Sequence, residues 1–328
     1  MQAIVLVGGM GTRLRPLTDT VPKPAVTLVD RPFLAYMIEW LAEHGVTEAV
    51  LACGSLPDQL REALGDGEHA GVSLTYVVEP DRRGTAGAIR YAAESLGDRL
   101  EDRFLALNGD VLTDLDLTEL LRAHDERAAR ATIGLYPVED SSVYGLVECH
   151  TNGSVLAFTE KTGEVVPGEI NAGAYVLERS VLELIPAGRQ FSIEREVFPR
   201  LVGDGLCALR LDGYWMDIGT PERYLQATWD ILEGRVETAV RPTAPGMFVG
   251  ADCALASTSR VGPRAVVSAG CAIEAEAIVD ASVLLPGCQV GEGARVRGSI
   301  LGAGAEVAPG AEVLDAMVAE NERVAGRQ

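Results

Sequence analysis

The stretch Ala3-Ile4-Val5-Leu6-Val7-Gly8-Gly9-Met10-Gly11-Thr12-Arg13 runs from five apolar residues directly into a glycine-rich turn. A short, continuous apolar run is typical of a buried strand in a parallel sheet, where ligands bind at the carboxyl end. Glycines let backbone N–H groups turn onto phosphate oxygens. A dinucleotide loop would need a third glycine where Leu14 stands, and a Walker loop would need Gly-Lys-Ser/Thr, which the chain lacks. The stretch therefore predicts a strand followed by a phosphate loop of another class.

Short apolar runs continue to alternate with amphipathic segments up to about residue 235. Phe33–His44 and Thr85–Leu96 are the predicted helices among them. Such alternation predicts a doubly wound, mainly parallel α/β sheet of the Rossmann-like type. The predicted strands are Ala3–Val7, Ala49–Cys53, Ser73–Val77 and Phe104–Leu107, then further strands, some antiparallel, at Ala131–Tyr136, Gly145–Cys149, Ser154–Phe158 and Ala172–Leu177.

The period of the sequence changes to six after a Pro-, Thr- and Ala-containing connector at 236–247. Aliphatic residues recur at this spacing with two one-residue slips, and a small residue lies two positions before most of them. Hexapeptide periodicity predicts a left-handed parallel β-helix of about four turns at 248–328. The aliphatic positions are Val249, Leu255, Val261, Val267, Ile273, Val279, Leu285, Val290, Val296, Leu301, Val307 and Val313.

Length and composition favour a two-domain globular protein, with domains at 1–235 and 248–328 and a linker at 236–247. The formal net charge of −20 argues against a nucleic-acid partner. The six cysteines contain no Cys-x-x-Cys pair, which favours free thiols in a reducing cytoplasm. No stretch approaches transmembrane length, so neither a membrane partner nor a membrane location is expected.

Only two lysines, Lys23 and Lys161, occur beside 26 arginines. Lysine is a compact point charge, whereas arginine is a wide planar fork. Codon bias with two chance survivors would also explain the count. However, Lys23 follows the glycine turn within a dozen residues of Arg13 and Arg15, which favours phosphate binding over a plain tight turn. Lys161 lies in Phe158-Thr159-Glu160-Lys161.

A series of ordered motifs across essentially the whole chain resembles the sugar-1-phosphate nucleotidyltransferases. The similarity is closest to the mannose-1-phosphate guanylyltransferase branch, through Ser192–Pro199 and Gly213–Asp217. One departure is Thr162, where the family usually has proline. The motifs are Gly8-Gly9-x-Gly11-Thr12-Arg13-Leu14-x-Pro16-Leu17-Thr18, Pro22-Lys23-Pro24, Glu79-Pro80, Gly84-Thr85-Ala86-Gly87, Asn108-Gly109-Asp110, Tyr144-Gly145, Glu160-Lys161, Ile170-Asn171-Ala172-Gly173 and Trp215–Pro221.

The resemblance implies an enzyme that joins GTP to mannose 1-phosphate, giving GDP-mannose and pyrophosphate by Mg²⁺-assisted in-line attack. It implies that Arg13, Lys23, Asp110, Lys161 and Asp217 are catalytic, the two aspartates holding the metal, although most aspartates are caps or turn residues. The implied nucleotide-binding residues are Leu6, Gly8, Gly9, Gly11, Thr12, Arg13, Lys23, Glu79, Gly84, Thr85 and Asp110. The implied sugar-phosphate-binding residues are Gly145, Glu160, Lys161, Asn171 and Gly173.

Glu79 lies on the loop that reads the base in this family. A carboxylate only accepts hydrogen bonds, and the guanine N1–H and N2–H₂ edge offers donors, which favours GTP. The alternative is a solvated loop acid beside Arg82 and Arg83. The same chemistry with glucose 1-phosphate and dTTP or UTP is the second hypothesis for the substrates.

Two other functions are weaker alternatives. A hexapeptide acyltransferase generally uses a histidine base, yet all four histidines precede the β-helix. A non-catalytic regulatory subunit would be expected to have lost part of the glycine turn, the lysines or the aspartates. We expect the β-helix to serve in oligomerisation, as a homodimer or tetramer, or in regulation.

Overall fold

The computed structural model describes residues 1–9, 11–54, 57–159, 163 and 165–326. The chain divides into two compact units. We call Met1–Gly9 with Met37–Trp215 the sheet unit, and Met10–Tyr36 with Met216–Gln328 the β-helix unit. None of the helices in the described ranges combines the length and apolarity needed to cross a membrane.

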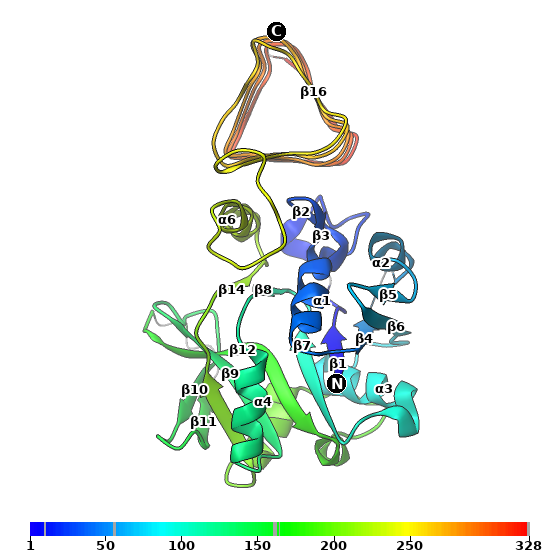
Figure 1. The fold of residues 1–328 in the computed structure, drawn as a ribbon, viewed down its shortest axis with the longest axis vertical. Helices are drawn as coiled ribbons and strands as arrows, with labels where there is room; N and C mark the ends of the chain where they lie inside the picture. The colour runs from blue at the N-terminus through cyan, green and yellow to red at the C-terminus, as the bar shows by residue number, and fades with distance from the viewer. Residues whose placement is uncertain (10, 55–56, 160–162, 164, 327–328) are drawn as a thin grey trace. The chain divides into compact units, whose positions relative to one another are not determined.

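The centre of the sheet unit is four parallel strands in the order β7-β1-β4-β6. Their bounds are β1 Gln2–Leu6, β4 Glu48–Cys53, β6 Val72–Val78 and β7 Arg103–Asn108. Because helices cover both faces of a parallel sheet, the middle of its central strand is apolar, and Ala3, Ile4 and Val5 are fully buried. The predicted doubly wound, mainly parallel sheet is confirmed (Figure 1).

Antiparallel strands extend this sheet beyond β7. β12 (Gly168–Glu178) pairs antiparallel with β7, β9 and β10, and β13 adds to β9. The remaining elements of the unit are α1 Phe33–Glu43, α2 Pro57–Leu64, β5 Glu68–His69, α3 Gly84–Leu96, η3 Gly97–Arg99, β8 Val111–Thr113, α4 Leu117–Glu126, β9 Ala131–Val138, β10 Leu146–Cys149, β11 Val155–Thr159, η4 Arg179–Leu184, the π-helix η5 Ile193–Val197, α5 Phe198–Leu201, β13 Leu206–Arg210 and β14 Trp215–Asp217, with α1 and β14 crossing its boundary.

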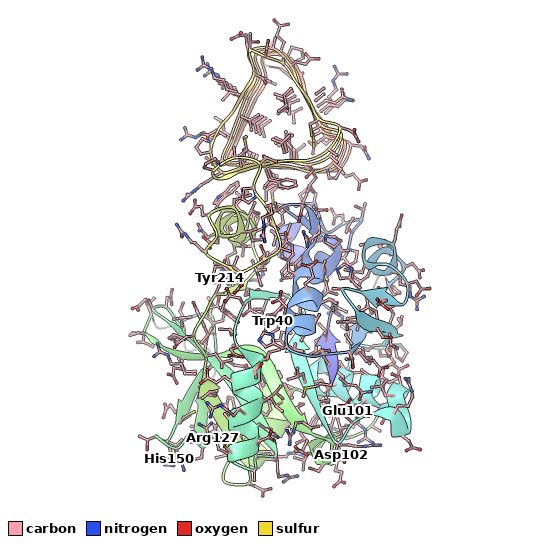
Figure 2. The ribbon with its side chains drawn as sticks, in the orientation of Figure 1. Trp40, Glu101, Asp102, Arg127, His150 and Tyr214 are labelled. Atoms are coloured by element: carbon pink, nitrogen blue, oxygen red, sulfur yellow. The ribbon has the colours of Figure 1, made fainter. Side chains whose placement is uncertain are left out.

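Three hydrogen bonds hold the segments around β8 and β14 in place. The indole Nε1 of Trp40, labelled in Figure 2, donates to the Leu115 carbonyl oxygen at 2.9 Å. Tyr214, also labelled, accepts from Thr113 Oγ1 at 2.8 Å through its carbonyl. Its N–H bonds to the Asp114 carboxylate. These bonds hold the segment after β8 against the segment that leads into β14.

The β-helix unit ends in three all-parallel sheets that form a triangular coil (Figure 1). Its interior is filled by stacked aliphatic and small side chains, of which Val267, Leu284 and Leu301 lie in successive coils. The predicted left-handed parallel β-helix is confirmed. Its strands are β15 Met247–Val249, β16 Ala254–Leu255, β17 Arg260–Val261, β18 Ala265–Val267, β19 Ala272–Ile273, β20 Ile278–Asp280, β21 Val283–Leu284, β22 Gln289–Val290, β23 Arg295–Arg297, β24 Ile300–Leu301, β25 Glu306–Val307, β26 Glu312–Leu314, β27 Met317–Val318 and β28 Arg323–Val324.

One position of the predicted repeat is wrong, and another is less buried than the repeat predicts. Leu284, not Leu285, is paired with Val267 and Leu301, because the first slip falls one hexapeptide earlier than the sequence pattern indicated. Leu255 is 40% exposed although it lies at an interior position. Its strand β16 is at the edge of its sheet, so no preceding coil covers it.

The rest of the β-helix unit is the segment after the glycine turn together with α6 (Pro221–Leu232). Tyr224 of α6 is buried and its hydroxyl donates to the Thr27 carbonyl oxygen. Thr220 caps the helix by accepting from the Arg223 N–H at 3.4 Å. The short elements here are η1 Thr12–Leu14, η2 Lys23–Ala25, β2 Thr27–Leu28 and β3 Arg31–Pro32.

Candidate active site

The sheet unit places Gly8 and Glu79 together just beyond the carboxyl ends of β1 and β6. A Cβ built on Gly8 would lie 3.7 Å from Glu79 Oε1, and one built on Gly54 would lie 2.9 Å from the Gly8 carbonyl oxygen. The Glu79 N–H bonds to the Cys53 carbonyl oxygen at 3.0 Å. The carboxylate of Glu79 therefore lies beside the start of the glycine turn.

Glu79 is a partly buried carboxyl group in need of donors. Burial raises the pKa of Glu79. Arg83 opposes that rise, because its backbone N–H donates to Glu79 Oε2 at 3.2 Å and its guanidinium is positively charged. The Arg83 guanidinium lies over the Tyr91 ring, 4.2 Å from its centre. A ligand edge with additional N–H donors would stabilise the charged form of Glu79 further.

Asp110 follows directly after β7, at the carboxyl edge shared with β1. The preceding Gly109 donates its N–H to the Leu6 carbonyl oxygen at 2.9 Å, which joins the ends of the two strands. Asp110 is half-buried and takes part in interactions of its own. Leu6, Gly8 and Asp110, predicted from distant motifs, are thus brought to one edge of the sheet.

The start of α3 is locked to the segment that precedes η5. The Phe191 carbonyl oxygen accepts from the Ala86 and Gly87 N–H groups at 3.0 and 3.2 Å. Gly84 has φ +68°, and a Cβ there would lie 2.7 Å from the same oxygen. Thr85 Oγ1 donates to Glu194 Oε2 at 2.9 Å and accepts from the Ile193 N–H at 2.8 Å. The Thr85 hydroxyl is therefore engaged by the protein.

The predicted sugar-side residues Asn171 and Gly173 lie on β12 where its pairing with β9 shifts register. Asn171 Nδ2 donates to Tyr175 Oη at 2.8 Å, and its Oδ1 accepts from the Gly173 N–H at 2.9 Å. Gly173 has φ +74°, and a Cβ there would lie 2.7 Å from Asn108 Nδ2. A bulge of this kind re-aims side chains next to many active sites.

An aromatic group lies beside Gly145 and Ala172. Trp215 stacks on Tyr136 with ring centres 5.6 Å apart, and Tyr144 meets Trp215 edge-on at 5.4 Å. Trp215 Nε1 donates to the Ala172 carbonyl oxygen at 2.8 Å. Trp215 thus bonds to the backbone of the Asn171–Gly173 motif and packs against the side chain of Tyr144, the residue before Gly145.

The β-helix unit gathers three cations around one carboxylate, and we call Arg13, Lys23, Asp217 and Arg223 the phosphate cluster. Lys23 is 7% exposed, and its Nζ lies 3.7 Å from Asp217 Oδ1. Arg223 Nη1 lies 3.2 Å from Asp217 Oδ2. A Cβ built on Gly219 would lie 2.6 Å from Arg13 Nη2 and 3.1 Å from Asp217 Oδ1.

The residues of the glycine turn in this unit adjoin the same cluster. The Gly11 carbonyl oxygen accepts from Thr18 Oγ1 at 2.8 Å, and Thr12 begins η1. A Cβ on Gly11 would lie 3.0 Å from Lys23 Cβ. Gly11 and Lys23 therefore lie side by side, with Thr18 next to both.

The donor set around Asp217 fits a divalent cation. Its Oδ1 atom is buried and has no hydrogen-bond partner among the described residues. Carboxylate oxygen is a preferred ligand of Mg²⁺, which usually binds one or two carboxylates together with substrate phosphates. Within the described ranges no cluster of three or more His, Cys, Asp or Glu side chains forms a metal site.

Two predicted site residues, Glu160 and Lys161, lie outside the described residues. Sequence reasoning missed Arg223 and Tyr175, and it gave no role to Trp215, the first residue of a family motif. Arg223 could have been noticed because it lies six residues after Asp217, in the first turn of α6. Glu194 was within a quoted motif but was given no role.

Comparison with known proteins places these features in one family. The Nucleotidyl transferase family model matches residues 2–234. The chain belongs to the nucleotidyl transferase family. A second model, GMPPB C-terminal domain, matches residues 243–326, which contain the β-helix.

The chain is also similar to proteins with assigned names. The chain is 40% identical over 237 residues to a mannose-1-phosphate guanylyltransferase of Mycobacterium tuberculosis, covering 71% of this chain and 65% of that protein. It is 34% identical over 272 residues to a UTP–glucose-1-phosphate uridylyltransferase of Synechocystis sp., covering 77% of this chain and 70% of that protein.

A solved structure supports the same fold assignment. Crystalline HddC from Yersinia pseudotuberculosis complexed with GMP-PN is 28% identical, with a TM-score of 0.61. The match covers 70% of this chain and 99% of that chain.

Proposed function

We propose that this protein joins GTP and mannose 1-phosphate to give GDP-mannose and pyrophosphate. The observation that carries the proposal is the phosphate cluster, where Arg13, Lys23 and Arg223 lie around the carboxylate of Asp217. An acidic chain that gathers three cations beside a glycine turn is suited to a small polyanion. The names of the mycobacterial relative and of the HddC complex support guanine and mannose.

In the proposed reaction, a phosphate oxygen of the sugar attacks the α-phosphorus of GTP in line, and pyrophosphate leaves. No covalent bond to the enzyme forms, so catalysis consists of positioning and charge stabilisation. Arg13 and Lys23 stabilise the charge that develops on the triphosphate. When bound by Asp110 and Asp217, Mg²⁺ supplies further neutralisation of phosphate charge.

Glu79 is the proposed reader of the base. Its carboxylate lies beside Gly8 and has a raised pKa, so the guanine N1–H and N2–H₂ donors would stabilise its charge. UTP or dTTP with glucose 1-phosphate is the second candidate pair, because the Synechocystis relative is named a uridylyltransferase.

The hexose 1-phosphate is proposed to contact β10, β12 and the segment between them. Gly145, Asn171 and Gly173 lie on the backbone that Trp215, Tyr136 and Tyr144 hold in place. Lys161 is proposed to bind the sugar phosphate, with Glu160 on a hydroxyl group. Thr85 and Gly84 are proposed to meet the nucleotide through their backbone, since the Thr85 hydroxyl is engaged by Glu194.

Domain roles are part of the proposal. We assign catalysis to residues 1–235 and oligomerisation to the β-helix, with 236–247 as linker. Residues 1–235 contain both lysines, both aspartates and α6, whose Tyr224 packs on Thr27. The six free cysteines fit a cytoplasmic location.

The proposal is tested by product identification. Purified protein is incubated with GTP, Mg²⁺ and isotopically labelled mannose 1-phosphate, and the products are separated by anion exchange. Label in a GDP-sugar, with one pyrophosphate released per GDP-sugar formed, supports the proposal. Pyrophosphate or phosphate release without transfer of label would refute it.

A further inference from the structure

We propose that Glu194 is a positioning residue that couples the nucleotide-binding start of α3 to the sugar-binding bulge of β12. The inference rests on the proposed function, because it assigns α3 to the nucleotide and β12 to the sugar. Glu194 itself is not placed on either substrate.

The first arm of the coupling is the bond to α3. Glu194 Oε2 accepts from the Thr85 hydroxyl at 2.9 Å and from the Ser192 hydroxyl at 2.8 Å. Thr85 in turn accepts from the Ile193 N–H at 2.8 Å, which closes a short ring between α3 and the start of η5. The Glu194 carboxylate therefore helps to orient the Gly84–Thr85 backbone, together with the Phe191 carbonyl that bonds to the next two residues.

The second arm runs through Tyr175 to Asn171. Tyr175 is fully buried, and its hydroxyl donates to Glu194 Oε1 at 3.5 Å while accepting from Asn171 Nδ2 at 2.8 Å. Burial raises the pKa of Tyr175 well above its ordinary range, and the Glu194 and Asp110 carboxylates raise it further. The hydroxyl keeps its proton and stays a donor to Glu194.

The direction of these bonds fixes the Asn171 amide. The Asn171 Nδ2 group donates to Tyr175, so the Asn171 Oδ1 atom faces Gly173. This oxygen accepts a hydrogen bond from the Gly173 N–H at 2.9 Å. If the Asn171 amide were reversed, its NH₂ group would face the Gly173 N–H, and two hydrogen-bond donors would lie against each other. A carboxylate at 194 thus determines which face of Asn171 is presented at the bulge, while also holding Thr85.

The matched control is Glu196 in the same π-helix. Its carboxylate accepts from the Ser192 N–H at 2.7 Å, so Glu196→Gln removes an equal charge from the same local segment. We expect Glu194→Gln to raise the KM for both substrates about 3- to 30-fold, as for other residues that couple two sites. Glu196→Gln should change either KM by less than about twofold, and loss of thermal stability should be similar in both variants.

Tyr175→Phe separates the arms, because it cuts only the link to Asn171. It should raise the KM for hexose 1-phosphate and leave the KM for the triphosphate unchanged. In the double variant Glu194→Gln/Tyr175→Phe, the rise in the hexose 1-phosphate KM should equal that of the larger single variant. The inference would be overturned if the hexose 1-phosphate KM of the double variant rose by the product of the two single-variant factors. It would also be overturned if Glu194→Gln and Glu196→Gln had identical kinetics.

The assay uses the nucleotide and hexose 1-phosphate pair that the wild-type protein turns over fastest, with calorimetric binding of each substrate measured in parallel. A wild type that prefers another pair refutes the proposed substrates and leaves the coupling test intact. A wild type that binds neither kind of substrate overturns both. Normal wild-type turnover with no difference between the two glutamine variants overturns the coupling alone.

Discussion

Replacing Asp217 with asparagine should change the stability of the protein, its Mg²⁺-dependent turnover and its affinity for GTP, each by a different amount and not all in the same direction. The change removes the charged partner that Asp217 offers to Arg223 and to Lys23, which is 7% exposed. Breaking a fully buried pair costs about 3–5 kcal/mol. Because the side chains of Asp217 and Arg223 are 20% and 30% exposed, solvent screening reduces the expected loss in unfolding free energy to about 1–3 kcal/mol.

This loss should lower Tm by roughly 2–12 °C. Pyrophosphate release at saturating Mg²⁺ should fall about 100-fold or more, as when an electrostatic stabiliser is removed. Without Mg²⁺ the sign reverses, because the substitution removes a negative charge that repels the triphosphate. GTP should then bind about tenfold more tightly in EDTA, a gain of about 1.4 kcal/mol.

The assays are thermal unfolding, coupled pyrophosphate detection and calorimetric GTP titration in EDTA. Asp212→Asn is the control, because Asp212 is 96% exposed and its nearest cation is Arg210 at 3.9 Å. It should leave all three measurements unchanged. Normal Mg²⁺-dependent turnover in Asp217→Asn, or weaker GTP binding in EDTA, would refute the assignment of Asp217 to the metal and the cluster.

Four further outcomes are expected. Glu79→Gln should shift the GTP:UTP ratio of kcat/KM about 5- to 150-fold toward UTP. Because burial raises the pKa of Glu79, the wild-type preference for GTP should also decline as the pH falls toward that pKa. A GTP:UTP ratio that does not change with pH would exclude Glu79 as the base reader. Lys23→Arg should impair use of the triphosphate and Lys161→Arg use of the sugar phosphate, each by roughly 30- to 1000-fold in kcat/KM; wild-type kinetics in both would show that lysine is not required. In denaturant unfolding, Gly84→Ala should lower the free energy of unfolding by about 2–4 kcal/mol, because Gly84 has a positive φ and its new Cβ would press on the Phe191 carbonyl. Gly97→Ala should lower it by only about 1–2 kcal/mol, because Gly97 has φ +56° but open space around it. Equal losses in the two variants would show that the contact with Phe191 contributes nothing. Residues 1–235 alone should fold and bind GTP in calorimetry while sedimenting as a smaller species, and a folded fragment that binds no GTP would assign part of the site to the β-helix.

Much of the fold follows from periodicity in the sequence. The runs that became β1, β4 and β7 are apolar in their middle because both faces of a parallel sheet are covered, whereas β6 is only partly buried. The hexapeptide period predicted the β-helix because each coil repeats the same interior position. The slip at Leu284 could not be placed, since Leu284 and Leu285 are both aliphatic and only pairing with Val267 decides between them.

The candidate site was predictable where a motif names its residues and not where tertiary contacts supply them. Lys23 and Asp217 are far apart in sequence, and the structure brings their charged atoms within 3.7 Å. Arg223 looks like any arginine on the first turn of a helix until its distance to Asp217 is known. Tyr175 looks like an ordinary buried strand residue, because nothing local shows that its hydroxyl lies between Asn171 and Glu194.

The central claim is most directly tested by one pyrophosphate-release measurement that crosses GTP, UTP, dTTP and ATP with mannose, glucose and galactose 1-phosphates. Each combination is run with Mg²⁺ and with EDTA. We expect the highest kcat/KM for GTP with mannose 1-phosphate, and no release with EDTA. A higher value for UTP or dTTP with glucose 1-phosphate, or release that does not require a sugar phosphate, would contradict it.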